Sequence, residues 1–159
     1  MMELLAQLER SGFSQWIRSS ESIFGYPGIL LLHTIGMGVV VGISAVVDLR
    51  ILGFAPALRL TGMEKFFPTL WVGFWLNAIT GVVLLTIDVT RKLGQPDFYA
   101  KMIFIAVAVV AVQTLRRDVF RDPAMDDTPP SGKARALALT SLVCWLGAIV
   151  SGRLLAYIG

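Results

Sequence analysis

Apolar residues fall into four long blocks along this chain, separated by short polar segments. Each block matches the stretch of roughly 18–20 residues that crosses the hydrocarbon layer of a membrane as an α-helix. The third block begins close to Lys101, so it spans only if this side chain reaches back to the headgroup layer. The predicted spans are residues 27–47, 66–87, 98–115 and 136–158.

The N-terminal segment has a different pattern, in which apolar and polar residues alternate at helical spacing. It lacks the basic leader and the continuous apolar core of a secretory signal peptide. The pattern predicts an amphipathic helix over residues 2–18 that lies on the membrane surface, with Trp16 at the level of the headgroups. The fold class expected is therefore all-α: a four-helix transmembrane bundle with an N-terminal interfacial helix. The polar connections are too short for a second domain, so residues 1–159 form one membrane domain.

Composition agrees with this reading. The chain is 55% hydrophobic and 16% charged, whereas soluble domains are about 45–50% apolar and about 25% charged. The net charge of +3 does not indicate a nucleic-acid partner, because the basic residues lie at the ends of the apolar blocks. The expected partner is the lipid bilayer. The lone Cys144 excludes an intrachain disulfide and a metal site built from several cysteines.

The distribution of basic residues predicts the orientation in a bacterial inner membrane. The first and third connections, residues 48–65 and 116–135, share one side and hold eight Lys and Arg. The N-terminal segment and the region around the second connection share the other side and hold five. Basic residues favour the cytoplasmic side, so both termini are expected to be periplasmic.

Small residues indicate where helices approach one another. Gly38 and Gly42, in the sequence GVVVG, have the spacing that lets two helix backbones come close in lipid. Ala148 and Gly152 repeat this spacing in the fourth block. The pattern predicts tight packing, either within the bundle or against a second copy or a partner membrane subunit.

Four ionisable residues lie within or at the ends of the spans: His33, Asp88, Lys101 and Arg153. Because consecutive helices alternate in direction, all four are expected in the same leaflet, with Asn77 nearer the mid-plane. An ionisable group in a bilayer costs about 2.5–3.5 kcal/mol on insertion scales and therefore needs a partner.

His33 is the only histidine of the chain. Imidazole binds haem iron, copper and zinc, and Met37 lies one helical turn further on nearly the same face. The tentative metal ligand is therefore His33, for haem iron or copper, with Met37 beside it. Lys101 and Arg153 could hold haem propionates, and the tryptophans, among them Trp75, offer flat surface for a macrocycle or a quinone. The alternative is structural: His33 hydrogen-bonds to a carbonyl or to Asp88 and fastens the bundle.

The sequence around His33, LLHTIGMGVVVG, is followed by DLRILG, and the third span opens KMIFIAVAVVAVQTLRR. This pattern resembles uncharacterised bacterial four-helix inner-membrane proteins. It is more distantly similar to the HemJ-type protoporphyrinogen oxidases and to the CopD-type copper-resistance membrane domains. The resemblance implies haem b as a cofactor, with His33 as its ligand and Lys101 as the lysine that opens a helix in those families. Both families carry further histidines that this chain lacks.

These observations leave three functions open and assign no catalytic residue. The first is a haem- or porphyrin-linked redox protein with a site near His33. The second is a non-catalytic membrane subunit or scaffold that packs against partner helices. The third is a protein linked to the transport of copper or a small solute. Motifs of soluble enzymes, such as a phosphate-binding loop, a nucleophile elbow or a CxxC pair, do not occur, so the sequence does not decide whether the chain is an enzyme.

Overall fold

The computed structural model describes residues 3, 7, 9–20, 22, 24–122 and 125–157, and within these residues it is entirely helical outside turns and loops. Four of the helices are long and apolar enough to cross a membrane, which confirms the all-α, four-span prediction. The helices are α2 (Gly12–Ser19), α3 (Tyr26–Leu52), η1 (Glu64–Phe66), α4 (Phe67–Thr86), α5 (Val89–Leu93), α6 (Pro96–Asp118) and α7 (Gly132–Tyr157).

The ends of the long helices follow ordinary helix signals. Pro27, Pro68 and Pro96 lie in the first turns of α3, α4 and α6, where the missing N–H of proline costs nothing. The Ser131 hydroxyl accepts a hydrogen bond from the Ala134 N–H at 3.1 Å at the start of α7. Helix α3 ends at Gly53, whose φ of 97° lies in the left-handed region that favours glycine.

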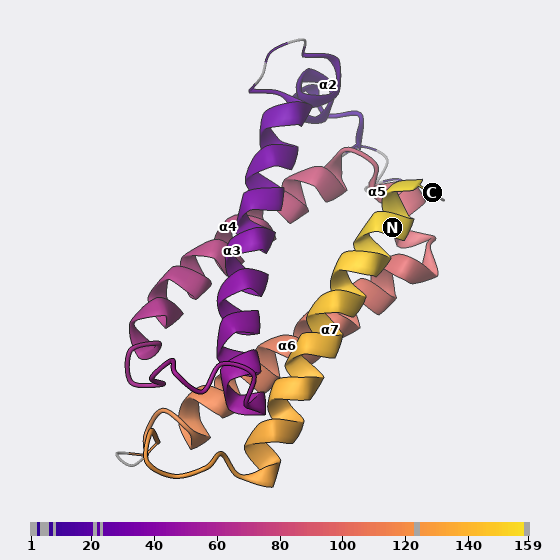
Figure 1. The fold of residues 1–159 in the computed structure, drawn as a ribbon. Helices are drawn as coiled ribbons and strands as arrows, with labels where there is room; N and C mark the ends of the chain where they lie inside the picture. Colours follow the sequence, from indigo (N-terminus) through magenta and orange to yellow (C-terminus); the bar gives the residue numbers. More distant parts are fainter. Residues whose placement is uncertain are drawn as a thin grey trace.

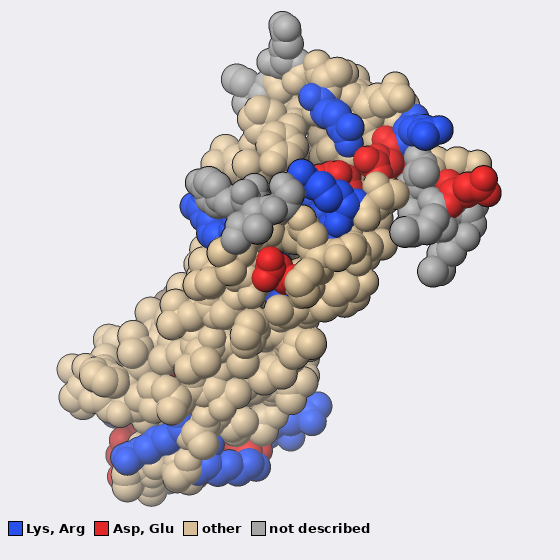
Figure 2. All heavy atoms as spheres, turned by 90° about the vertical axis from the view of Figure 1, so that its right-hand side faces the viewer, with Lys and Arg blue, Asp and Glu red and all other residues tan. Residues whose placement is uncertain are grey.

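The long helices form two hairpins. Helix α3 packs on α4, α6 packs on α7, and close packing of α3 on α7 joins the two pairs. Figure 1 shows α3 and α4 crossing, with α6 and α7 running side by side. The segments 53–63, 119–122 and 125–131 lie together at one end, which we call the basic end, while α2 and α5 lie at the other. In Figure 2 the charged side chains gather toward these two ends, and an uncharged band separates them.

The hydrophobic core sits toward the basic end. Fully buried apolar side chains from all four long helices meet there, and Phe67 and Phe120 pack edge to face with ring centroids 4.9 Å apart. The core side chains include Val40, Val47, Ile51, Phe67, Leu70, Val112, Leu115, Ala138 and Trp145. Toward the other end the helices expose more of their apolar surface, as expected for side chains that face lipid.

The structure corrects the prediction of one helix end and narrows the prediction of where the small residues pack. Asp48 was expected in the first polar connection, but it lies inside α3, which continues to Leu52. Gly38 and Gly42 do not pack against another described helix, because an added Cβ at either would meet only open space. The close approach uses Gly36 and Gly73 instead: a Cβ on Gly36 would lie 2.8 Å from the backbone of Asn77 and of Gly73.

The predicted interfacial helix is present over Gly12–Ser19, and several of its earlier residues lie outside the described ones. Phe13 and Trp16 are exposed, whereas Ser14 and Ile17 are buried against the protein. The Ser14 hydroxyl donates to the Thr86 carbonyl at 3.3 Å, and the Arg18 guanidinium donates to the Ile87 carbonyl. Helix α2 is therefore docked on the end of α4, with aromatic side chains facing outward.

Candidate functional site

His33 lies at the crossing of α3 and α4, half-buried. Its Nδ1 is 3.0 Å from the Asn77 carbonyl oxygen and 3.1 Å from the Thr80 hydroxyl. A carbonyl can only accept, so this contact places the imidazole proton on Nδ1. In the neutral ring the Nε2 atom then carries the lone pair, which is the form in which imidazole binds a metal.

Asn77 of α4 also forms a hydrogen bond across this helix crossing. Its side-chain Nδ2 donates to the His33 carbonyl oxygen at 2.7 Å, so each residue bonds the backbone of the other. Gly81 makes room for the ring, since a Cβ there would lie 3.1 Å from Cε1 of His33. The sequence hypothesis of a satisfied structural histidine and that of a ligand both fit this arrangement, because Nδ1 is bound and Nε2 is not engaged by these contacts.

The other candidate residues lie at different distances from this crossing. Lys101 extends along α7, with Nζ 3.4 Å from the position of a Cβ on Gly152, and it is close enough to His33 to interact electrostatically. Arg153, the next residue of α7, is exposed. Asp88 pairs with Arg91 at 2.8 Å. Lys101 thus lies near His33, whereas Asp88 forms its ion pair with Arg91.

Met37 and Trp75 line neither of the two described cavities. Met37 is half-buried one turn further along α3. Two ligands one turn apart on a helix approach a metal from the same side, so they cannot occupy opposite faces of a haem. Trp75 is 61% exposed and presents its ring outward. Among the described residues no three His, Cys, Asp or Glu side chains lie together as a metal-binding group.

A second polar cluster lies in the core and was missed by the sequence reasoning. The carboxyl group of Asp48 is 1% exposed, and its Oδ2 accepts a hydrogen bond from the Ser44 hydroxyl at 3.2 Å. The Ser44 hydroxyl also lies 3.1 Å from that of Ser141 and accepts the indole N–H of Trp145 at 3.0 Å. These bonds join α3 to α7 in the interior of the bundle.

Asp48 remains incompletely satisfied. Its Oδ1 is buried and has no hydrogen-bond partner among the described residues. A cavity of about 10 Å³ adjoins it, lined in part by Ser44, Phe67 and Val112, which is about the minimum that holds one water molecule. The available sequence signal was the four-residue spacing of Ser44 and Asp48, which puts both on one helix face. Because the charged Asp48 follows directly after the first apolar run, its position suggested the end of the helix instead.

No protein-family model, curated protein or solved structure matches this chain.

Proposed function

We propose that this multi-pass membrane protein binds a haem or related porphyrin through Nε2 of His33 and takes part in electron transfer at a bacterial inner membrane. The observation that carries the proposal is the contact of His33 Nδ1 with the Asn77 carbonyl. In metal-binding histidines, the second nitrogen characteristically donates to a carbonyl or carboxylate, which fixes the tautomer and the orientation of the ring.

The surrounding residues limit how the group would be held. Lys101 supplies a cation near His33, and Arg153, which follows Gly152 in α7, is exposed. Both suit carboxylates at the edge of a macrocycle. His33 lines neither of the two described cavities, so the macrocycle would contact lipid or a second copy. When bound, haem would supply one-electron redox chemistry, and Nε2 of His33 would hold its iron.

The test is the absorption spectrum of the detergent-purified protein, oxidised and dithionite-reduced, after expression with added haem precursor. We expect a Soret band that is lost in His33→Ala and retained in Thr34→Ala, an exposed neighbour that only bonds its own helix. Asn77→Ala should keep the band, because it removes the side-chain bond to the His33 carbonyl and leaves the backbone carbonyl that contacts Nδ1 in place. A spectrum without haem bands in the folded wild-type protein would reject the proposal. His33 would then have only the structural role of linking α3 to α4 by hydrogen bonds.

A second candidate function is a non-catalytic subunit that packs against a partner helix. It is favoured by the open space at Gly38 and Gly42, which face away from the other described helices. Small residues on an outward face permit a close helix–helix contact in lipid. Gly38→Ile and Gly42→Ile should then abolish a complex seen by cross-linking in membranes, whereas Val82→Ile, on the exposed part of α4, should not. Unchanged cross-linking in both glycine variants would exclude this surface.

A further inference from the structure

A cavity lies between α4 and α6 at the basic end, where α4 begins and α6 ends. Its volume is about 460 Å³, within the range of roughly 300–1,000 Å³ typical of small-molecule sites. It is lined by Glu64, Phe67, Trp71, Val112, Gln113, Arg116, Arg117 and Arg121. His33 is not among the residues that line this cavity.

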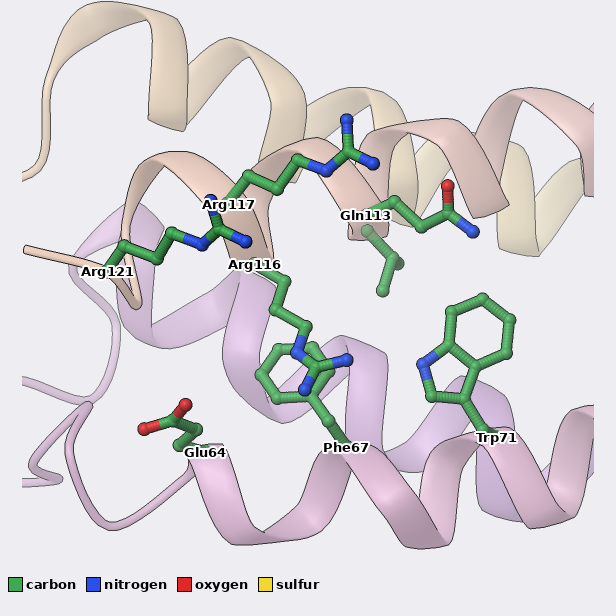
Figure 3. Close-up of a pocket in the computed structure, with 8 residues that line it drawn as sticks. Glu64, Phe67, Trp71, Gln113, Arg116, Arg117 and Arg121 are labelled. Atoms are coloured by element: carbon green, nitrogen blue, oxygen red, sulfur yellow. The ribbon is translucent and has the colours of Figure 1, made fainter.

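Three arginines give the cavity a positive charge. In Figure 3, Arg116 reaches from α6 across the space, while Arg117 and Arg121 lie along the α6 wall. None of the three forms an ion pair with a carboxylate of the described residues, whereas Arg18, Arg91 and Lys133 do. Glu64, on the opposite wall, is the one carboxylate among the lining residues. Three guanidinium groups against one carboxylate favour the binding of an anion.

The inner wall of the cavity is apolar and aromatic. Phe67 and Trp71 come from α4, and Val112 comes from α6. The Arg116 guanidinium lies over the Phe67 ring, 5.4 Å from its centroid, and this stacking holds the group in the cavity. A ligand that fits both walls carries a negative group beside an apolar portion.

The position of the cavity agrees with such a ligand. Glu64 precedes α4, Arg121 follows α6, and both helices are membrane spans. The arginines therefore lie where a span meets the headgroup layer, with Trp71 and Val112 about one turn deeper. Basic pockets between membrane helices are characteristic sites for anionic lipid headgroups, and guanidinium groups match phosphate with paired hydrogen bonds.

We propose that this cavity is a binding site for the phosphate of an anionic phospholipid, held by Arg116, Arg117 and Arg121 with its glycerol and upper acyl region against Phe67 and Trp71. The proposal is independent of haem binding at His33.

The experiment is native mass spectrometry of the full chain in neutral detergent, titrated with phosphatidylglycerol and, separately, with phosphatidylcholine. We expect selective retention of phosphatidylglycerol. Arg116→Gln, Arg117→Gln and Arg121→Gln should each weaken it by about fivefold, since one cation near the membrane surface contributes about that factor. Arg135→Gln is the matched control, because Arg135 is an exposed arginine near the start of α7 that does not line the cavity.

Glu64→Gln gives a test with the opposite sign and does not depend on removing a contact. It deletes the one opposing charge, so phosphatidylglycerol should bind more tightly than to the wild-type protein. Equal losses in Arg121→Gln and Arg135→Gln would mean that only net charge matters and would overturn the site. Glycerol phosphate that binds as tightly as the lipid would assign the cavity to a soluble anion and overturn the lipid assignment.

Discussion

Gly36 and Gly73 set the distance between α3 and α4. An added Cβ on Gly36 would lie 2.8 Å from the Asn77 nitrogen and the Gly73 carbonyl oxygen, while one on Gly73 would lie 2.8 Å from a Val39 methyl group. The obstacle at Gly36 is backbone, which cannot rotate away. The hydrogen bonds between His33 and Asn77 depend on this approach, because they span the same crossing.

Gly36→Ala should therefore destabilise the protein. Forcing the helices apart typically costs about 1–3 kcal/mol in a well-packed contact, and it also weakens the His33–Asn77 bonds. Gly38→Ala is the control: its Cβ meets open space, and alanine is the better helix former by up to about 1 kcal/mol. Unfolding in mixed micelles of mild detergent and SDS measures both variants. Equal stabilities of the two would contradict the assigned contact.

The Ser44 hydroxyl contacts Asp48, Ser141 and Trp145 in the buried polar cluster. Ser44→Ala would leave the Trp145 N–H without its acceptor and Asp48 Oδ2 without its donor. A buried polar group left unpaired costs about 1–3 kcal/mol, so we expect a loss of at least that size in the same unfolding assay. Thr34→Ala removes a hydroxyl that is exposed and should change stability by less than about 0.5 kcal/mol. A loss no larger than that of Thr34→Ala would show that the cluster contributes little.

At the scale of elements, polar contacts fasten the N-terminal segment to the α4–α5 junction. The Thr90 hydroxyl donates to the Glu9 carboxylate at 2.6 Å, and Arg18 lies 3.6 Å from the same carboxylate. The hydrogen bond from Thr90 is the main cause that lowers the pKa of Glu9 below its usual value, and the Arg18 charge acts in the same direction. The N-terminal segment and the second connection thus lie on one side of the molecule. This is expected, because two membrane-spanning helices, α3 and α4, lie between them in the chain.

This contact should weaken in acid. Because the pKa of Glu9 is lower in the folded protein, its contribution to stability is present above the unfolded pKa of about 4.3. It is lost as the pH falls through the lower folded value. The melting temperature of the wild-type protein should thus fall more between pH 6 and about pH 3 than that of Glu9→Gln. Parallel curves for the two proteins would show that the carboxylate does not couple to folding.

The four spans were predictable because their apolar runs are long, whereas their exact ends and facing surfaces were not. Asp48 suggested an end, yet α3 continues because Ser44 bonds to the carboxyl group and Gly53 supplies the actual stop. The partners of His33 come from α4, and sequence periodicity does not say which faces of two helices meet. The same limit explains Gly38, which has the spacing of a contact but lies on the outer face.

At the scale of the molecule, the first and third connections are bonded to each other. The Asp126 carboxylate accepts hydrogen bonds from the Leu60 N–H at 2.6 Å and from the Thr61 hydroxyl at 2.7 Å. The Thr61 bond is the main cause that lowers the pKa of Asp126. Both connections therefore lie on one side of the molecule. From their basic residues we predict that this side is cytoplasmic.

Labelling of introduced cysteines tests this orientation. Leu58→Cys and Asp127→Cys lie in the first and third connections, and Gly94→Cys lies in the second; all three positions are exposed. In intact spheroplasts a membrane-impermeant maleimide should label only Gly94→Cys, with the other two labelled after permeabilisation. The native Cys144 is buried and should give little background. The reverse pattern would invert the orientation, and different results for Leu58→Cys and Asp127→Cys would contradict the topology.

The arrangement in two hairpins has a consequence for biogenesis. Each hairpin buries its own helix–helix contact, and the two meet mainly through α3 and α7, with the Ser44–Ser141 contact in that seam. The α3–α4 pair can therefore enter the membrane and close before α6 leaves the ribosome. Two separately translated halves, divided in the exposed turn at Gly94, should accordingly find each other in the bilayer and assemble into the intact protein.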